Sequence, residues 1–170
     1  GEEEARQAAI RIADIGFQVA YTSALTRAQR TLEVILEANG WSLPVIRDQA
    51  LNERHYGDLQ GLNKDDLRRQ YGPEQVHIWR RSYDVAPPNG EALKGTAART
   101  LPFFERCILG DIRHGKNVLV VAHGNSNRSI VMQLASLSGE EVVKLELATG
   151  LPLVYELEAD GGVVSKRVLE

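Results

Sequence analysis

The sequence has 170 residues but a single cysteine, Cys107, and no apolar run long enough to cross a bilayer. One cysteine cannot form a disulfide framework or a zinc cluster within a chain. A membrane-spanning helix needs roughly 20 predominantly apolar residues in succession. These absences argue against small disulfide-bonded secreted scaffolds and integral membrane proteins, and they favour the reducing environment of the cytoplasm.

Neither sign of charge dominates. The 20 Lys and Arg residues are nearly balanced by 23 Asp and Glu residues, and the net charge is -3. Proteins that bind nucleic acid or anionic membranes through their overall charge are basic, so neither partner is predicted. No His, Cys, Asp or Glu residues have the spacing of a metal site, and we expect no metal.

Short apolar strands alternate with amphipathic helices along most of the chain. Helices are expected at 3–15, 25–38, 94–109 with an interruption near Pro102, 126–137 and 140–145. Strands are expected at 19–23, 44–46, 117–122, 152–157 and 163–168, the last two as a hairpin. The pattern predicts one α/β domain over residues 1–170, a three-layer sandwich with a mostly parallel sheet flanked by helices.

One candidate site lies where the apolar strand 117–122 gives way to a helix, in the sequence AHGNS (122–126). Ligands of α/β sheets bind at the carboxyl ends of strands, and the free N–H groups of a helix N-terminus favour anions. Gly124 would let the backbone approach a ligand closely. The alternative is a helix cap at Asn125 or Ser126 with His123 packed beside it. The strand-end position and the Gly-Asn pair favour the anion site.

A second strand-to-helix junction, TSALTRA (22–28), places Arg27 in the first turn of a helix. A cation there opposes the helix dipole and should have a compensating partner. A phosphate held through two parallel hydrogen bonds is one such partner. An Asp or Glu at the surface is the other, and this motif alone favours neither.

Two more candidates fall between residues 52 and 89, a long insertion rich in charge, Gly, Pro and aromatic residues. Such insertions are often functional. The stretch LNERHYGDLQGLNK (51–64) contains Glu53, whose pKa would rise among apolar or anionic neighbours and so permit proton exchange near neutral pH. The stretch VHIWRRSY (76–83) contains Arg80 and Arg81, which suit a clamp for a carboxylate and a phosphate. The alternative for both is a solvated surface.

Taken in order, these stretches resemble one family. TSALTRAQRTL (22–32), LNERHYGDLQGLNK (51–64), QVHIWRRSYD (75–84), AHGNS (122–126) and ATGLPLVYEL (148–157) are similar to the cofactor-dependent phosphoglycerate mutases of the histidine phosphatase superfamily. The resemblance runs nearly from the first residue to the last. LNERHYG followed by GLNK and WRRSYD is specific to the mutase branch, whereas AHG marks only the superfamily.

The resemblance implies a cytoplasmic isomerase of glycolysis and gluconeogenesis that interconverts 3-phosphoglycerate and 2-phosphoglycerate through a phosphohistidine. The implied cofactor is 2,3-bisphosphoglycerate, which primes the enzyme, and no metal is implied. The implied partners are small-molecule phosphoglycerates, and the implied assembly is a homodimer or homotetramer.

By position, the resemblance assigns catalytic roles to three residues. His123 would support the transferring phosphoryl group, Glu53 would be the general acid and base, and Arg27 would bind phosphate. The implied substrate-binding residues are Arg27, Glu53, Tyr56, Lys64, Arg80, Arg81, Gly124 and Asn125. Arg54 lies in the motif without a direct role. Converging cations suit phosphoryl transfer, which rests on positioning and on neutralising spread negative charge.

The family's nucleophile is a histidine in an Arg-His-Gly motif that ends a strand. Here the triplet occurs at 113–115, before the strand 117–122, so we expect a surface turn at the amino edge of the sheet. Because the sequence opens at Gly1 without Met, we expect the nucleophile and the first central strand to lie upstream. We therefore expect the 170 residues alone to be inactive.

Two other functions stay open at this point. A broad-specificity phosphatase of the same superfamily would use the same phosphate ligands. A non-catalytic phosphate-binding module would need no nucleophile. The additional cations Lys64, Arg80 and Arg81 favour the mutase, because they would retain a bisphosphorylated intermediate while it turns, and a phosphatase gains nothing from that retention.

Overall fold

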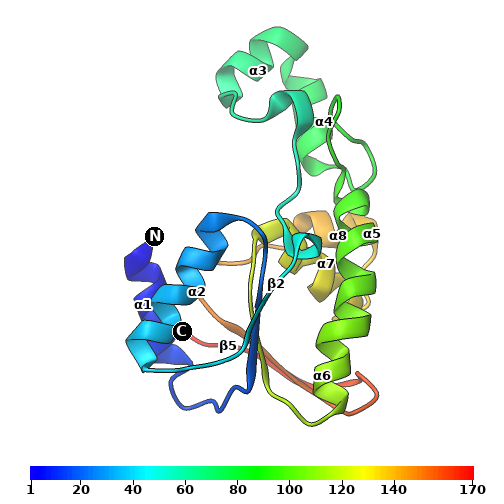
Figure 1. The fold of residues 1–170 in the computed structure, drawn as a ribbon. Helices are drawn as coiled ribbons and strands as arrows, with labels where there is room; N and C mark the ends of the chain where they lie inside the picture. The colour runs from blue at the N-terminus through cyan, green and yellow to red at the C-terminus, as the bar shows by residue number, and fades with distance from the viewer.

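The computed structural model describes all 170 residues (Figure 1). Its central sheet has three parallel strands in the order β2-β1-β3, in which β1 is Val19–Thr22, β2 is Val45–Arg47 and β3 is Val118–Val121. A separate antiparallel hairpin pairs β4 (Leu153–Leu157) with β5 (Val163–Val168). The predicted α/β class is confirmed, with three of the five expected strands in the parallel sheet.

Helices cover both faces of this sheet. On one face, α1 (Glu2–Arg11) and α2 (Thr26–Asn39) pack together, and Ala9, Ile12 and Ile35 are buried against Leu119 and Val121 of β3. Figure 1 shows α1 and α2 on the side of the sheet away from α5 and α6. The arrangement is the predicted three-layer sandwich.

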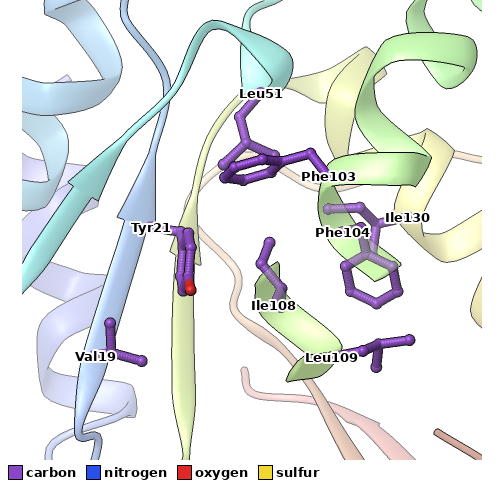
Figure 2. Packing of buried hydrophobic residues seen from close by; sticks show 8 residues of the cluster. All are labelled: Val19, Tyr21, Leu51, Phe103, Phe104, Ile108, Leu109 and Ile130. Atoms are coloured by element: carbon purple, nitrogen blue, oxygen red, sulfur yellow. The ribbon is translucent and has the colours of Figure 1, made fainter. Parts of the chain in front are cut away.

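The opposite face carries the larger core (Figure 2). There α5 (Leu93–Phe103) continues through a π-helical turn (Phe104–Ile108) into α6 (Leu109–Arg113), and α7 (Gly124–Leu134) packs beside α5. The buried side chains of this cluster are Val19, Tyr21, Leu51, Phe103, Phe104, Ile108, Leu109 and Ile130. Regular α-helical bonding ends one residue after Pro102, which has no N–H to donate. The predicted interruption is confirmed.

The insertion forms an arm that projects from the sandwich (Figure 1). After the short turns Gln49–Leu51 and Gly57–Leu59 it contains two helices, α3 (Lys64–Tyr71) and α4 (Pro73–Arg81). Their buried residues are Leu67, Val76 and Trp79, which pack with Leu59 as a small separate core. These helices were not among the predicted elements, because they are only 8 and 9 residues long and lie in a stretch whose charged, Gly and Pro residues favoured a loop.

The remaining elements fall close to their expected places. The expected helix 140–145 is α8 (Gly139–Lys144), whereas the expected helix 3–15 ends at Arg11 and the expected helix 126–137 runs from Gly124 to Leu134. No helix combines the length and the apolar character needed to cross a membrane.

Candidate active site

The carboxyl ends of the three parallel strands bring the predicted residues of the sheet together. Thr22, the last residue of β1, pairs with Arg47 of β2 and Val121 of β3, so all three strands end at the same level. The Thr22 hydroxyl also donates a 2.7 Å hydrogen bond to the Val121 carbonyl. Ser23 and His123, which lie just beyond β1 and β3, therefore meet at this edge.

His123 is 8% exposed, and its Nε2 lies 2.8 Å from the Ser23 hydroxyl oxygen. Burial lowers the pKa of His123 below its usual value of 6.5. Glu53 acts in the opposite direction, and the charges of Arg27 and Arg99 add to the lowering. The imidazole is therefore neutral near pH 7, with one donor nitrogen and one acceptor nitrogen.

The Glu53 carboxylate lies at the N-terminus of α7. Its Oε1 accepts hydrogen bonds from the backbone N–H groups of Asn125 at 3.1 Å and Arg54 at 2.9 Å. A Cβ added at Gly124 would lie 3.8 Å from Glu53 Oε2 and 3.2 Å from the Arg128 guanidinium. The helix N-terminus therefore binds an anion in this structure, as its dipole favours, and that anion is the candidate acid/base residue.

Arg27 is exposed in the first turn of α2, which contains no acidic residue. It forms no ion pair with any Asp or Glu. The surface ion pair that was the alternative reading of this motif is therefore not formed. Its guanidinium remains free to bind an anion.

Arg27 and Glu53 line one cleft of about 570 Å³, together with Arg99 of α5. The cleft wall comes from the start of α2, from the segment that follows β2, and from the region of Glu91 and α5. Ten of its twelve lining residues are polar or charged, among them three acidic residues and three arginines. Of these arginines, Arg54 and Arg99 donate to protein groups.

Of the predicted site residues, only Arg27 and Glu53 line this cleft; His123, Gly124 and Asn125 do not. The four remaining substrate-binding candidates lie on the arm and do not line it either. Lys64 begins α3, and Arg80 and Arg81 end α4. All three are exposed and form no ion pair. The Arg54 guanidinium lies over the Tyr56 ring, with its Cζ 4.9 Å from the ring centroid.

The sequence reasoning missed residues that hold the site in place. Arg54 is only 4% exposed and donates to the carbonyls of Glu91 at 2.7 Å and Trp79 at 2.6 Å. It therefore links the segment after Glu53 to α4 of the arm and to the region before α5. Ser23 contacts His123, and Arg99 contacts the segment around Glu53. Only Ser23 carried a signal in the sequence, since it follows a β-prone run as His123 does.

The triplet Arg113-His114-Gly115 lies at the other end of the sheet. The helix α6 ends at Arg113, and β3 begins afterwards at Val118. The exposed His114 has its Nδ1 2.7 Å from the Gly110 carbonyl oxygen. Its predicted position as a surface turn at the amino edge is confirmed. No group of three or more His, Cys, Asp or Glu side chains is arranged to hold a metal ion.

Comparison with known proteins gives consistent matches over the whole chain. The sequence profile of the histidine phosphatase superfamily (branch 1) matches residues 1–169. A 2,3-bisphosphoglycerate-dependent phosphoglycerate mutase from Parvibaculum lavamentivorans is 58% identical over 172 residues, covering 99% of this chain and 82% of the relative. A phosphoglycerate mutase from Schizosaccharomyces pombe is 53% identical over 173 residues, covering 100% and 82%. The alpha-ribazole phosphatase from Shigella flexneri superposes with a TM-score of 0.82 at 26% identity, covering 99% of this chain and 80% of that one.

Proposed function

The chain belongs to branch 1 of the histidine phosphatase superfamily, and we propose that it interconverts 3-phosphoglycerate and 2-phosphoglycerate with 2,3-bisphosphoglycerate as primer. The observation that carries this proposal is the unpaired Arg27, which lines the same cleft as Glu53. The buried His123 does not line that cleft, but the charges of Glu53 and Arg27 both act on the pKa of its imidazole. The identity of 58% and 53% to relatives named as mutases supports the same reaction. The reaction belongs to glycolysis and gluconeogenesis, so we expect it in the cytoplasm.

Arg27 and His123 would act on the phosphoryl group. A guanidinium can hold two phosphoryl oxygens through parallel hydrogen bonds. The neutral imidazole of His123 would donate a hydrogen bond to a further oxygen as charge develops there. When bound, 2,3-bisphosphoglycerate would supply the phosphoryl group that primes the enzyme, and the unpaired Arg27 suits such an anion.

Glu53 would move the proton. As the substrate hydroxyl attacks the phosphohistidine that the resemblance implies, an O–P bond would form, the P–N bond would break, and the hydroxyl proton would pass to the Glu53 carboxylate. In the reverse step the histidine would take the phosphoryl group back, and Glu53 would return the proton to the departing oxygen. Its contact with the Asn125 N–H keeps the carboxylate beside the turn at 124–125. Because the Asn125 N–H already donates to Glu53, the Gly124 N–H is the backbone donor of that turn that would bind a phosphoryl oxygen.

The arm would bind the rest of the substrate. We propose that Lys64, Arg80 and Arg81, with Tyr56, hold the carboxylate and the distal phosphate. The three cations are exposed and unpaired, so a ligand would displace no protein carboxylate from them. These cations would keep a bisphosphorylated intermediate bound while it reorients in the site.

We expect the 170 residues alone to take up no phosphoryl group. His123 follows β3 but is buried against Ser23, and His114 lies at the far end of the sheet. His77 is exposed on α4, and Nδ1 of His55 already accepts a bond from the Gly57 N–H. Intact-mass measurement after exposure to 2,3-bisphosphoglycerate tests this, and a stable adduct on any of the four histidines would contradict it.

The test of the reaction uses the full-length gene product, dephosphorylated and freed of bound phosphoglycerates. We expect 3-phosphoglycerate to be isomerised only after 2,3-bisphosphoglycerate is added. An undiminished rate without it would contradict the priming. Release of inorganic phosphate faster than isomerisation would instead establish a phosphatase, the activity named for the similar Shigella flexneri structure. Binding without either reaction would establish a non-catalytic module.

Two further proposals concern the protein as a whole. We propose that residues 1–170 form one domain, because α5 continues the arm directly into the main core. We also propose a homodimer or homotetramer, on the family resemblance, and light scattering of the purified protein would test it.

A further inference from the structure

Arg99 of α5 has every donor engaged within the protein. Its Nε and Nη2 donate to the two carboxylate oxygens of Glu91 at 2.9 and 2.8 Å. Its Nη1 donates to the carbonyls of Gln49 at 3.3 Å and Ala50 at 2.9 Å, and Nη2 also donates to the Glu53 carbonyl at 3.0 Å. A guanidinium has five N–H donors. All five are used, so none remains for a phosphate.

The Glu91 carboxylate extends this contact to the residues that follow Glu53. Its Oε1 accepts the backbone N–H of His55 at 3.2 Å. The backbone N–H of Glu91 in turn donates to the His55 carbonyl at 2.7 Å. One ion pair therefore fixes the carbonyl of Glu53 and the peptide groups two residues later.

From this geometry we propose that Arg99, held by Glu91, is a positioning residue for Glu53. The inference rests on the proposed function, in which Glu53 exchanges a proton with the substrate. Although Arg99 lines the cleft, it acts through the backbone of Glu53 and does not bind the ligand. Arg27 differs from Arg99 in this respect, because it lines the same cleft but has no ion-pair partner, so its guanidinium can bind a ligand.

Arginine is needed here for its shape as well as its charge. The planar fork meets a carboxylate and several carbonyls in fixed directions, whereas a lysine ammonium is a compact charge with three donors. Arg99→Lys therefore keeps the charge in the cleft but cannot reproduce all five bonds. A displacement of about 1 Å at a reacting group can cost roughly 100-fold in rate.

The test is a double-mutant cycle in the full-length gene product, with Arg99→Lys, Glu53→Gln and the double variant. We expect Arg99→Lys to lower kcat by about 10- to 100-fold while KM for 3-phosphoglycerate changes by less than about threefold. We expect no further loss when it is added to Glu53→Gln, because residues that act as a unit are not additive. Multiplicative losses, or a rise in KM alone, would overturn the proposal.

Arg113→Lys is the matched control. Arg113 forms an ion pair of 2.8 Å with Glu105 but is exposed and lies on α6, so its replacement should leave both constants unchanged. If Arg99→Lys does not fold, Glu91→Gln is a milder change that removes only the charge of the carboxylate partner. It should also lower kcat, and it should cause no further loss of kcat when added to Glu53→Gln. An unaltered kcat in a folded variant of either residue would overturn the proposal.

The two proposals fail in distinguishable ways. A wild-type protein without isomerase activity would refute the proposed function. In that case, hydrogen exchange of residues 49–55 still tests whether Arg99 and Glu91 anchor this segment. Exchange there should be faster in Arg99→Lys than in wild type, and unchanged in Arg113→Lys. Equal protection in wild type and Arg99→Lys would refute the anchor itself.

Discussion

Replacing Arg27 with Gln removes a cation from the first turn of α2, where it faces the positive end of the helix dipole with no ion-pair partner. An unfavourable charge at this position costs about 0.3–1 kcal/mol. We therefore expect Arg27→Gln to raise the free energy of unfolding by about that amount. The measurement is urea unfolding of the 170-residue protein at low ionic strength.

The same substitution should weaken ligand binding. A hydrogen bond to a charged group contributes about 1.5–3 kcal/mol, and about 1.4 kcal/mol corresponds to a tenfold change in affinity. Loss of the guanidinium should therefore raise the dissociation constant of 3-phosphoglycerate by about 10- to 100-fold. Titration calorimetry on the full-length gene product measures it. A cation that lowers stability and strengthens ligand binding is what a binding role predicts.

Arg30→Gln is the control for this pair of effects. Arg30 lies on the same helix but is paired with Glu2 at 3.0 Å and Glu33 at 3.3 Å. Its replacement removes the same charge and should slightly lower stability without changing affinity. The reasoning is refuted if Arg27→Gln destabilises the protein and leaves binding intact, or if both variants weaken binding equally.

Two further predictions concern stability. Burial alone would raise the pKa of Glu91, but hydrogen bonds led by that from Arg99 hold it below its usual value of 4.5. Its contribution to stability is present above that value and is lost as pH falls through the lowered folded pKa. Urea unfolding of Glu91→Gln should show lower stability at pH 7 and a smaller loss on acidification below pH 4.5, and an unchanged acid limb would contradict this. A Cβ at Gly57, which has φ +60°, would lie 2.1 Å from the Pro88 carbonyl oxygen. Gly57→Ala should lower the free energy of unfolding by more than about 1–3 kcal/mol. It should lower it more than Gly61→Ala does, because Gly61 also has a positive φ but a Cβ there would meet nothing within 4 Å. Equal decreases in melting temperature for the two variants would refute the close approach at Gly57.

The sequence predicted the sandwich well because its signals are local. The run 118–122 is apolar throughout, and β3 lies between two cores. Helix ends were predicted less well. The expected end near 137 falls instead at Leu134, and Ser136 takes a positive φ of 54°, a left-handed conformation that glycine signals in a sequence and serine does not.

The candidate site was predicted in part for the same reason. Residues that follow strands can be found from the sequence, and His123 and Arg27 were found in this way. The contact between Arg99 and Glu53 spans 46 residues and has no local pattern, since Arg99 occupies an ordinary helical position. The arm helices were missed because they are short and lie in a stretch rich in charge, Gly and Pro, and their small core is shared between segments.

The most direct measurement is the pKa of His123, determined by NMR titration of the full-length gene product with and without 3-phosphoglycerate. The His123→Gln variant identifies the resonance of His123. In the free protein burial keeps this pKa below 6.5. A phosphate dianion bound against the imidazole favours the charged form, so the pKa should rise on binding. An unchanged pKa in protein saturated with 3-phosphoglycerate would show that the phosphate does not bind at the carboxyl end of β3.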